Sequence, residues 1–195
     1  MEKKPSRKEM THSRIVETAA RAIRRGGYNG VGVADIMKEA GLTHGGFYAH
    51  FPSRDAMLAE ALDYAGRHAA TAVADRSAKL LREGASPFRA LVESYLSDAH
   101  LASLDSGCPV AALASDMPRQ SPEVQEASRM RVRALLETVQ QALSSAIQGP
   151  HAQVIASTMV GALQLARAFG NNPQGKALLA ANRNALILQY DKPTH

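Results

Sequence analysis

Hydrogen-bonding side chains and a pair of glycines share the short stretch that follows Gly41. Hydroxyl and imidazole groups that can contact phosphates or base edges occur there at Thr43, His44, Tyr48 and His50. Gly45 and Gly46 lie among them, and a glycine in a helix costs about 1 kcal/mol relative to alanine. That cost predicts another use for the pair, which is close approach of the backbone to a partner. Neither a nucleophile–base pair nor clustered carboxylates accompany these residues, so the chain is not expected to be an enzyme.

Two short helices separated by a tight turn must position this stretch. The first is expected over residues 34–40, and Thr43 is expected to cap the second, which covers residues 44–50. Phe47 and Phe51 lie four positions apart, so both can pack inward. The arrangement is that of a helix-turn-helix, whose second helix enters the major groove of DNA with its N-terminal residues toward the base edges.

The excess positive charge of the chain is concentrated before this unit. Residues 1–25 hold eight of the 23 basic and three of the 18 acidic side chains, which leaves 15 of each for the remainder. A helix that begins at the capping-box pair Ser6 and Glu9 carries several of these basic residues, including Lys8 and Arg14. Such a segment is expected of a surface that contacts phosphates, and a solvated tail is the alternative interpretation.

Five short motifs follow one another between residues 27 and 55. They are Gly27-Tyr28, Asp35-Ile36, Ala40-Gly41-Leu42-Thr43, Phe47-Tyr48-Ala49-His50-Phe51 and Ser53-Arg54-Asp55. Through these motifs residues 15–60 resemble the DNA-binding segment of the TetR family of regulators. The resemblance implies that Thr43, Tyr48, His50 and Arg54 hold phosphates, and that His44 and Gly45 face bases. The family usually has a threonine or serine where this chain has Val31 and Gly32, so the hydroxyl that often caps the second helix is missing.

The rest of the sequence predicts helices throughout, and therefore an all-α fold with about nine helices. Proline and glycine breaks delimit the later helices. A long fourth helix is expected to begin after the cap Ser53, and the others are expected at about residues 86–104, 108–117, 121–147, 151–169 and 174–190. Residues 1–53 are expected to form the helix-turn-helix domain. Residues 54–195 are expected to form a helical domain for ligand binding and dimerisation, as the resemblance implies. No spacing typical of metal ligands or of a nucleotide-binding loop occurs, so no cofactor is expected.

The last two predicted helices carry an apolar face that is rich in small residues. On the first helix this face consists of Val154, Ser157, Thr158, Gly161, Ala162, Leu165 and Phe169. On the second it consists of Ala177, Leu178, Ala181, Ala185 and Leu188. Small residues let helices approach closely, so two helices from each of two chains would form a four-helix bundle. A two-fold homodimer presents its reading helices about 34–36 Å apart and prefers a palindromic operator in double-stranded DNA.

Cys108 lies between Gly107 and Pro109 at a predicted helix start. The helix dipole there favours a thiolate, which would react with electrophiles or oxidants. The stretch from Gly107 to Ala114 also resembles a segment of some TetR-like regulators that respond to reactive compounds. The alternative is a small, buried, apolar cysteine. A second possibility is a pocket for a neutral or weakly polar ligand, with candidate lining residues that are also common in plain cores: Tyr95, His100, Met117 and Met159.

Together these patterns predict a dimeric, cytoplasmic transcriptional regulator, a repressor that a small molecule or thiol-reactive compound releases from its operator. One cysteine cannot form a disulfide within the chain, which fits a reducing compartment. Residues 138–166 lack charged side chains, but polar residues and Pro150 interrupt them, so no membrane span is expected. The alternative is a helical adaptor or ligand-binding protein that does not bind DNA.

Overall fold

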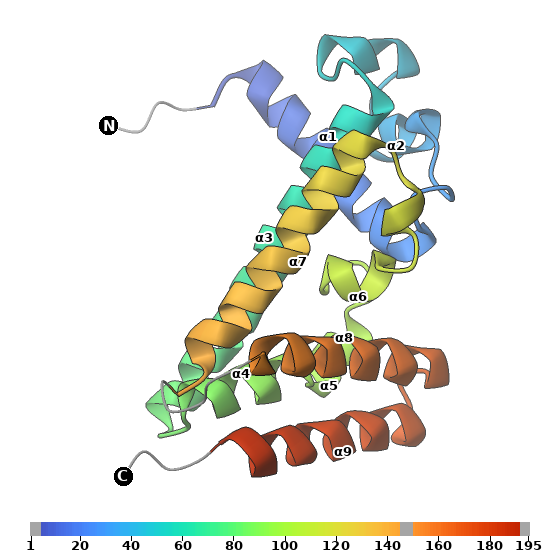
Figure 1. The fold of residues 1–195 in the computed structure, drawn as a ribbon. Coiled ribbons are helices and arrows are strands. Elements are labelled where there is room, and N and C mark those ends of the chain that lie inside the picture. The colour runs from blue at the N-terminus through green and yellow to red at the C-terminus, as the bar shows by residue number, and fades with distance from the viewer. Residues whose placement is uncertain (1–4, 145–149, 192–195) are drawn as a thin grey trace.

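The computed structural model of the chain describes residues 5–144 and 150–191, and within them it holds helices and no β-strand (Figure 1). The elements are α1 (Arg7–Gly26), α2 (Val33–Glu39), the 3₁₀ helix η1 (His44–Ala49), α3 (Arg54–Arg82), α4 (Pro87–Tyr95), α5 (Asp98–Ala102), α6 (Pro109–Leu113), the 3₁₀ helix η2 (Met117–Arg119), α7 (Pro122–Ala142), α8 (His151–Phe169) and α9 (Pro173–Tyr190). The predicted all-α fold with nine helices is confirmed for these ranges. Residues 1–4 of the basic segment lie outside them.

The first helix begins and ends as the sequence predicts. The Ser6 hydroxyl accepts from the Glu9 backbone N–H at 3.2 Å, and the Glu9 carboxylate accepts from the Ser6 N–H at 2.6 Å. Ile15 and Ile23 of α1 are fully buried, and the helix packs against α3. Gly27, at φ 73°, ends α1 in a backbone conformation that only glycine adopts without strain.

Helices α3 and α7 lie side by side and cross the molecule from the N-terminal helices to α8 and α9 (Figure 1). The 29 residues of α3 make a rod about 44 Å long at 1.5 Å per residue. Ser53 caps this rod, because its hydroxyl accepts from the Ala56 N–H at 2.9 Å. The first turns of α3 bury Met57 and Leu58 beside α1, and later turns pack against α4 and α7. One helix therefore contributes to both ends of the protein.

Helices α8 and α9 pack on each other at the end of the molecule remote from η1 (Figure 1). The buried apolar residues form one continuous cluster that extends from Ile15 in α1 to Tyr190 in α9. None of the helices in the described ranges has the length and apolar composition needed to cross a membrane.

Three predicted helices differ in their bounds from the structure. The helix predicted over residues 108–117 ends at Leu113, and the separate 3₁₀ helix η2 covers Met117–Arg119. The single helix predicted over residues 86–104 is wrong, since α4 ends at Tyr95 and α5 begins after Ser97. The Ser97 hydroxyl accepts from the His100 N–H at 3.2 Å and so caps a new helix. The helix predicted over residues 121–147 ends at Ala142, because Leu143 takes an extended conformation with ψ 145°. Residues 145–147 of that prediction lie outside the described residues.

Candidate DNA interface and ligand cavity

Helix α2 and the 3₁₀ helix η1 form the predicted helix-turn-helix. Phe47 and Phe51 are both 1% exposed, as expected, and their stacked rings, 5.6 Å apart, anchor η1 to the core. The helix predicted over residues 44–50 is present as a 3₁₀ helix over His44–Ala49, in which two glycines disfavour regular α-helix. Thr43 stands at its N-cap without a side-chain capping bond, which corrects that prediction. Helix α2 likewise begins at Gly32 without a side-chain cap, as the missing hydroxyl implies.

The outer surface of η1 gathers several of the predicted DNA contacts. Thr43, His44 and Gly45 are exposed. Tyr48 is 73% exposed, which is high for an aromatic side chain. Its ring meets Phe47 edge-on at 5.2 Å, so the exposed tyrosine is held from below by the core. These residues present hydroxyl, imidazole and bare backbone groups on a single exposed element.

The two glycines of η1 are not required by packing within the protein. A Cβ added at Gly45 would meet no described atom within 4 Å. At Gly46 it would make only ordinary contacts, with Met37 Cε at 3.7 Å and Thr43 Oγ1 at 3.9 Å. Neither glycine has a positive φ. The protein therefore accepts two residues with low helix propensity where alanine would fit.

His50 closes η1 beside a small polar cluster on α1 and α3. His12 stacks on Phe51 at 4.4 Å, and its Nε2 lies 2.7 Å from a carboxylate oxygen of Glu60. Burial lowers the pKa of His50, and the electrostatic effects of the neighbouring His12 and Lys8 lower it further. Its buried Nδ1 has no hydrogen-bond partner among the described residues. His50 is therefore harder to protonate than a free imidazole, at the edge of the exposed element.

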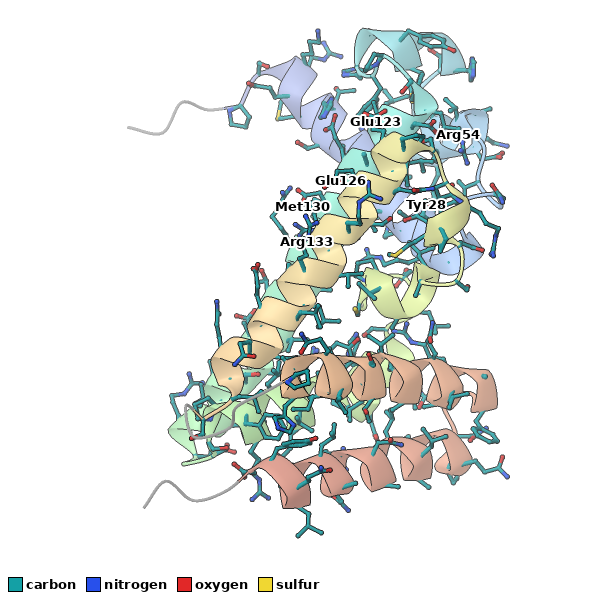
Figure 2. The ribbon with its side chains drawn as sticks, in the orientation of Figure 1. Tyr28, Arg54, Glu123, Glu126, Met130 and Arg133 are labelled. Carbon is teal, nitrogen blue, oxygen red and sulfur yellow. The ribbon has the colours of Figure 1, made fainter. Side chains whose placement is uncertain are left out.

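The predicted basic contacts occupy different positions around η1. Lys8 and Arg14 are exposed on α1. Arg54 instead turns inward and donates to the carbonyls of Tyr28 and Val31, so its guanidinium ties the α1–α2 loop to the start of α3 (Figure 2). Lys38 is exposed in the last turn of α2, and the sequence analysis did not single it out. The position of this lysine just before the turn of the helix-turn-helix could have indicated a phosphate contact.

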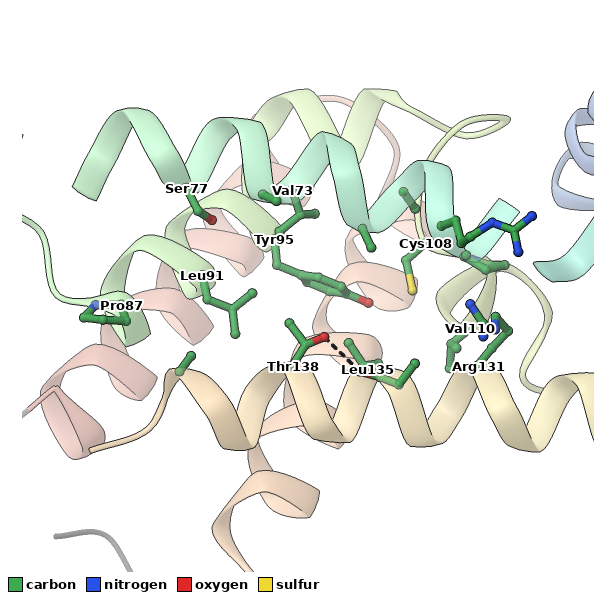
Figure 3. Close-up of a pocket in the computed structure, with 18 of the residues that line it drawn as sticks. Val73, Ser77, Pro87, Leu91, Tyr95, Cys108, Val110, Arg131, Leu135 and Thr138 are labelled. Atoms are coloured by element: carbon green, nitrogen blue, oxygen red, sulfur yellow. Dashed lines mark hydrogen bonds between the residues drawn. The ribbon is translucent and has the colours of Figure 1, made fainter. Parts of the chain in front are cut away.

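An apolar cavity of about 340 Å³ lies between α3, α4, α6 and α7 (Figure 3). Short and branched apolar side chains form much of its wall, among them Ala69, Val73, Leu91, Val110, Ala134 and Leu135. Two of the predicted ligand residues, Tyr95 and Cys108, line it. The other three are not part of the wall. His100, Met117 and Met159 are buried in the surrounding core, at 2%, 7% and 0% exposed.

Most hydroxyl groups that face the cavity are already hydrogen-bonded. Thr138 donates to the Ala134 carbonyl at 2.8 Å, and Ser77 contacts Ser94 Oγ at 3.0 Å. Tyr95 differs: it is 3% exposed, and its hydroxyl has no partner of good geometry in the described part of the chain. Its polar neighbour is the Cys108 thiol, which is a weak donor and acceptor. Burial, with a smaller effect of Cys108, raises the pKa of Tyr95 well above its usual value, so the phenol stays protonated.

The peptide bond that joins Gly107 to Cys108 is held from both sides. The Cys108 N–H donates to His100 Nε2 at 2.9 Å, and His100 Nδ1 in turn donates to the Tyr95 carbonyl at 2.7 Å. These bonds fix a neutral imidazole, and burial lowers the pKa of His100 to about 4. A Cβ on Gly107 would lie 2.5 Å from Arg167 Nη2 and 2.6 Å from the Ser103 carbonyl oxygen. Only glycine fits this position, which adjoins the cavity wall.

Arg24 of α1 reaches the same peptide bond from the N-terminal helices. Its guanidinium donates to the carbonyls of Ala20 at 2.9 Å, Ala65 at 3.4 Å and Gly107 at 3.2 Å. The residue is only 7% exposed, and burial lowers its pKa to about 10. One buried side chain therefore joins α1, α3 and the loop before α6. This role of Arg24 could not be predicted from the sequence, because an arginine in an amphipathic helix is ordinarily exposed.

A second inter-element contact lies beside α7. Tyr28, in the loop after α1, is fully buried next to Ser128, and burial raises its pKa to about 12 (Figure 2). The α1–α2 loop thus packs against α7 as well as α3.

The predicted apolar face of α8 and α9 is largely exposed. Val154, Leu165 and Leu188 are 52%, 59% and 87% exposed, and Phe169 is 52% exposed. Ser157, Ala177, Ala181 and Ala185 are also exposed, while Thr158, Gly161 and Leu178 are partly so. Ala162 is the exception, because at 4% exposed it faces the core. Four large apolar side chains open to solvent on two packed helices make this face a candidate interaction surface.

Comparison with known proteins matches both halves of the chain. Residues 15–61 match the family described as bacterial regulatory proteins of the tetR family, and residues 84–181 match the tetracyclin repressor-like C-terminal domain. An uncharacterized HTH-type transcriptional regulator of Mycobacterium tuberculosis is 30% identical over an alignment of 165 residues, which covers 79% of this chain and 82% of the relative.

Solved structures show the same fold at lower sequence identity. A TetR family regulator from Agrobacterium tumefaciens has a TM-score of 0.74 at 22% identity, covering 94% of this chain and 98% of the other. The reduced form of NemR from Escherichia coli has a TM-score of 0.69 at 23% identity, covering 90% and 96%. With its helix-turn-helix, its second helical domain and these relatives, the chain belongs to the TetR family of DNA-binding transcriptional regulators, which are not enzymes.

Proposed function

We propose that the chain is a repressor that binds a palindromic operator as a homodimer and leaves the operator when its cavity is occupied. One observation carries the proposal: the exposed contact residues of η1 and the exposed apolar face of α8 and α9 lie at opposite ends of the molecule (Figure 1). Two copies joined through that face would leave both η1 elements free to reach DNA. Such a protein works where the chromosome is, in the cytoplasm.

The DNA contacts proposed for each protomer follow exposure and chemistry. His44, with the bare backbone of Gly45 and Gly46, would meet base edges. Phosphates would be held by Thr43, Tyr48, His50, Lys8 and Arg14. Arg54 would support them through the α1–α2 loop, and could reach a phosphate only by leaving the Tyr28 and Val31 carbonyls.

Fluorescence anisotropy with labelled duplexes from the DNA upstream of the gene tests this assignment. Replacing a base-contacting side chain costs about 1–3 kcal/mol, so His44→Ala should weaken operator binding by roughly 5- to 150-fold and relax specificity. Tyr48→Phe removes one hydroxyl and should weaken binding to every duplex by a smaller, uniform factor. Arg129→Ala, an exposed change on α7, is the matched control and should leave affinity unchanged. Failure of the wild-type protein to bind any native upstream duplex would refute the repressor proposal.

Release is proposed to start in the cavity and to reach η1 through α3 and the Gly107–Cys108 peptide. A ligand that fills the space beside Cys108 pushes on α3 and on the loop that Arg24 grips. Two arrangements of the dimer then differ in the spacing of their reading elements, and the ligand favours the arrangement that does not fit DNA.

The inducer is either a reversible small molecule or a compound that reacts with Cys108. For an α,β-unsaturated carbonyl, the Cys108 sulfur would add to the β-carbon, the C=C π bond would break, and the thiol proton would pass to the α-carbon. The buried Tyr95 hydroxyl next to the thiol supports this possibility, because it could donate to the carbonyl oxygen. Cys108→Ser should abolish release by N-ethylmaleimide. Equal release of wild type and variant would eliminate the thiol mechanism and leave reversible binding.

A helical adaptor that binds protein instead of DNA remains the second candidate function. The exposed apolar face of α8 and α9 favours it, because that face could take a different partner. Light scattering separates the two, since an adaptor without self-association would have the mass of one chain.

A further inference from the structure

The polar atoms left unpartnered in the cavity wall indicate what kind of molecule the cavity accepts. Ser77 and Thr138 use their hydroxyls within the protein. The Tyr95 hydroxyl and Arg131 Nε are buried and have no hydrogen-bond partner among the described residues. Buried polar groups in proteins are normally paired, so an unpaired buried donor in the wall of a cavity indicates a ligand acceptor.

Both donors lie toward the same end of the cavity. Figure 3 shows the Tyr95 hydroxyl directed toward Cys108, Val110 and Arg131, while Pro87 and Leu91 form the opposite end. A ligand with an acceptor at one end and an apolar body would therefore lie along α3 with its acceptor near Cys108.

The charges at this end argue against a ligand that carries its own charge. Arg131 Nη2 already pairs with Asp63 at 3.1 Å, and Asp63 also pairs with the largely exposed Arg67. Gly66 makes this arrangement possible, since a Cβ there would lie 2.5 Å from Arg131 Cδ. The rest of the wall is mostly apolar, and transfer of a carboxylate into such a space without a free counter-ion is strongly unfavourable.

We infer that the cavity takes a small, uncharged, largely apolar molecule with a single hydrogen-bond acceptor, such as a ketone oxygen, which accepts a hydrogen bond from the Tyr95 hydroxyl. This inference rests on the proposed ligand role of the cavity and names its chemical class. The volume of about 340 Å³ is near the lower end for ligand pockets, so compounds of one ring and a short chain suit it.

Three probes of nearly equal shape test the class by isothermal titration calorimetry on the full-length protein. They are 4-phenylbutan-2-one, its hydrocarbon analogue (3-methylbutyl)benzene, and the carboxylate 3-phenylpropanoate. None reacts with a thiol, so Cys108 chemistry does not enter. The ketone should bind at least tenfold more tightly than the carboxylate. Equal or tighter binding of the carboxylate, or no binding of the ketone at millimolar concentration, would overturn the inference.

A thermodynamic double-mutant-type cycle, which combines removal of the ligand oxygen with removal of the Tyr95 hydroxyl, tests the hydrogen bond itself. A neutral hydrogen bond is worth a factor of about 2 to 12, so Tyr95→Phe should weaken the ketone by that factor and leave the hydrocarbon unaffected. Thr138→Val, whose hydroxyl is already bonded to Ala134, is the control and should not discriminate between the two probes. A loss that is equal for ketone and hydrocarbon would refute the Tyr95 contact. If Tyr95→Phe does not fold, the ranking of the three probes on the wild type decides.

DNA binding is measured separately on the same preparations. If the protein binds the ketone but binds no native duplex, the proposed repressor function is refuted and the inferred ligand class is retained. If the protein binds the operator but does not bind the ketone, the inferred ligand class is refuted and the proposed DNA-binding function is retained.

Discussion

The same substitution, glycine to alanine, should have opposite consequences at Gly107 and at Gly45. At Gly107 the new methyl group would lie 2.5 Å from Arg167 Nη2, 2.6 Å from the Ser103 carbonyl oxygen and 2.9 Å from His100 Cδ2. A carbonyl of the main chain cannot move aside cheaply, so the Gly107 segment itself must shift. Overpacking of this kind costs about 1–3 kcal/mol.

The shift would also disturb two hydrogen bonds of the Gly107–Cys108 peptide. The carbonyl would move away from Arg24 Nη1 and the N–H from His100 Nε2. A buried group left unpaired costs about another 1–3 kcal/mol, so Gly107→Ala should lower the free energy of unfolding by about 2–6 kcal/mol. That is a large part of the 5–15 kcal/mol typical of a folded domain.

At Gly45 the alanine methyl group would enter open space, at a φ that alanine tolerates. Gly45→Ala should therefore leave the free energy of unfolding unchanged or raise it by up to about 1 kcal/mol. Its effect should fall on operator affinity, with a loss of about tenfold, or 1.4 kcal/mol, because the methyl group would separate the backbone from the bases.

Urea unfolding followed by circular dichroism gives the stabilities, and anisotropy gives the affinities. The reasoning about Gly107 fails if its alanine variant unfolds within 0.5 kcal/mol (about the size of an ordinary surface change) of the wild type. The reasoning about Gly45 fails if its variant binds the operator as tightly as the wild type does.

Three further predictions concern Arg24, His100 and Leu188. Arg24→Met should change the free energy of unfolding by less than about 2 kcal/mol, because relief of the burial that lowers the Arg24 pKa to about 10 offsets the lost hydrogen bonds. It should nevertheless weaken the response of operator affinity to a cavity ligand, and a variant that responds as strongly as the wild type would refute the role of Arg24 in transmission. His100 has a folded-state pKa of about 4 against an ordinary 6.5, so below pH 6.5 the unfolded state binds the proton more readily than the folded state does. The free energy of unfolding should therefore fall by about 3 kcal/mol as the pH drops from 6.5 to 4. Urea titrations at several pH values should show this loss in the wild type and a smaller one in His100→Gln. Leu188→Glu, at a position 87% exposed, should halve the mass measured by light scattering without lowering the stability of the single chain, and an unchanged mass would exclude this face from the interface.

The sequence predicted the elements whose signals are local. The Ser6–Glu9 capping box, the glycines at 26 and 27, and the prolines at 87, 109, 122 and 173 all mark the helix boundaries found in the structure. Helix starts depend on side chains next to the start, which is why such signals can be read without a tertiary structure.

Predictions that depended on competition between local signals were less accurate. Ser97 can cap a helix or continue one, and the apolar pattern around it favoured continuation over the cap that actually forms. In η1 the helix-turn-helix pattern predicted a helix without its type, and Gly45 and Gly46 lower α-helix propensity enough for a 3₁₀ helix to form.

The candidate cavity was only half predictable. Tyr95 and Cys108 line it, but Met117 and Met159 pack elsewhere, because an apolar residue at helical spacing does not reveal which neighbour it meets. Arg131 and Gly66 act as a pair from different helices, and Arg24 meets carbonyls 41 and 83 positions away. Contacts at such separations are set by the way the helices pack and leave no pattern in the sequence.

Because the apolar cluster is continuous from α1 to α9, the N-terminal helices cannot simply be separated from the rest of the chain. Residues 1–53 alone would lose the turns of α3 that cover Ile15 and Ile23, as well as the loop that satisfies Arg24. Fusing the helix-turn-helix to a different ligand-binding domain would therefore require the first half of α3. It would also require a hydrogen-bond acceptor for Arg24 in place of the Gly107 carbonyl. Chimeras cut at the end of the helix-turn-helix should misfold, whereas chimeras that exchange only the solvent-facing residues of η1 should fold and carry the new operator preference.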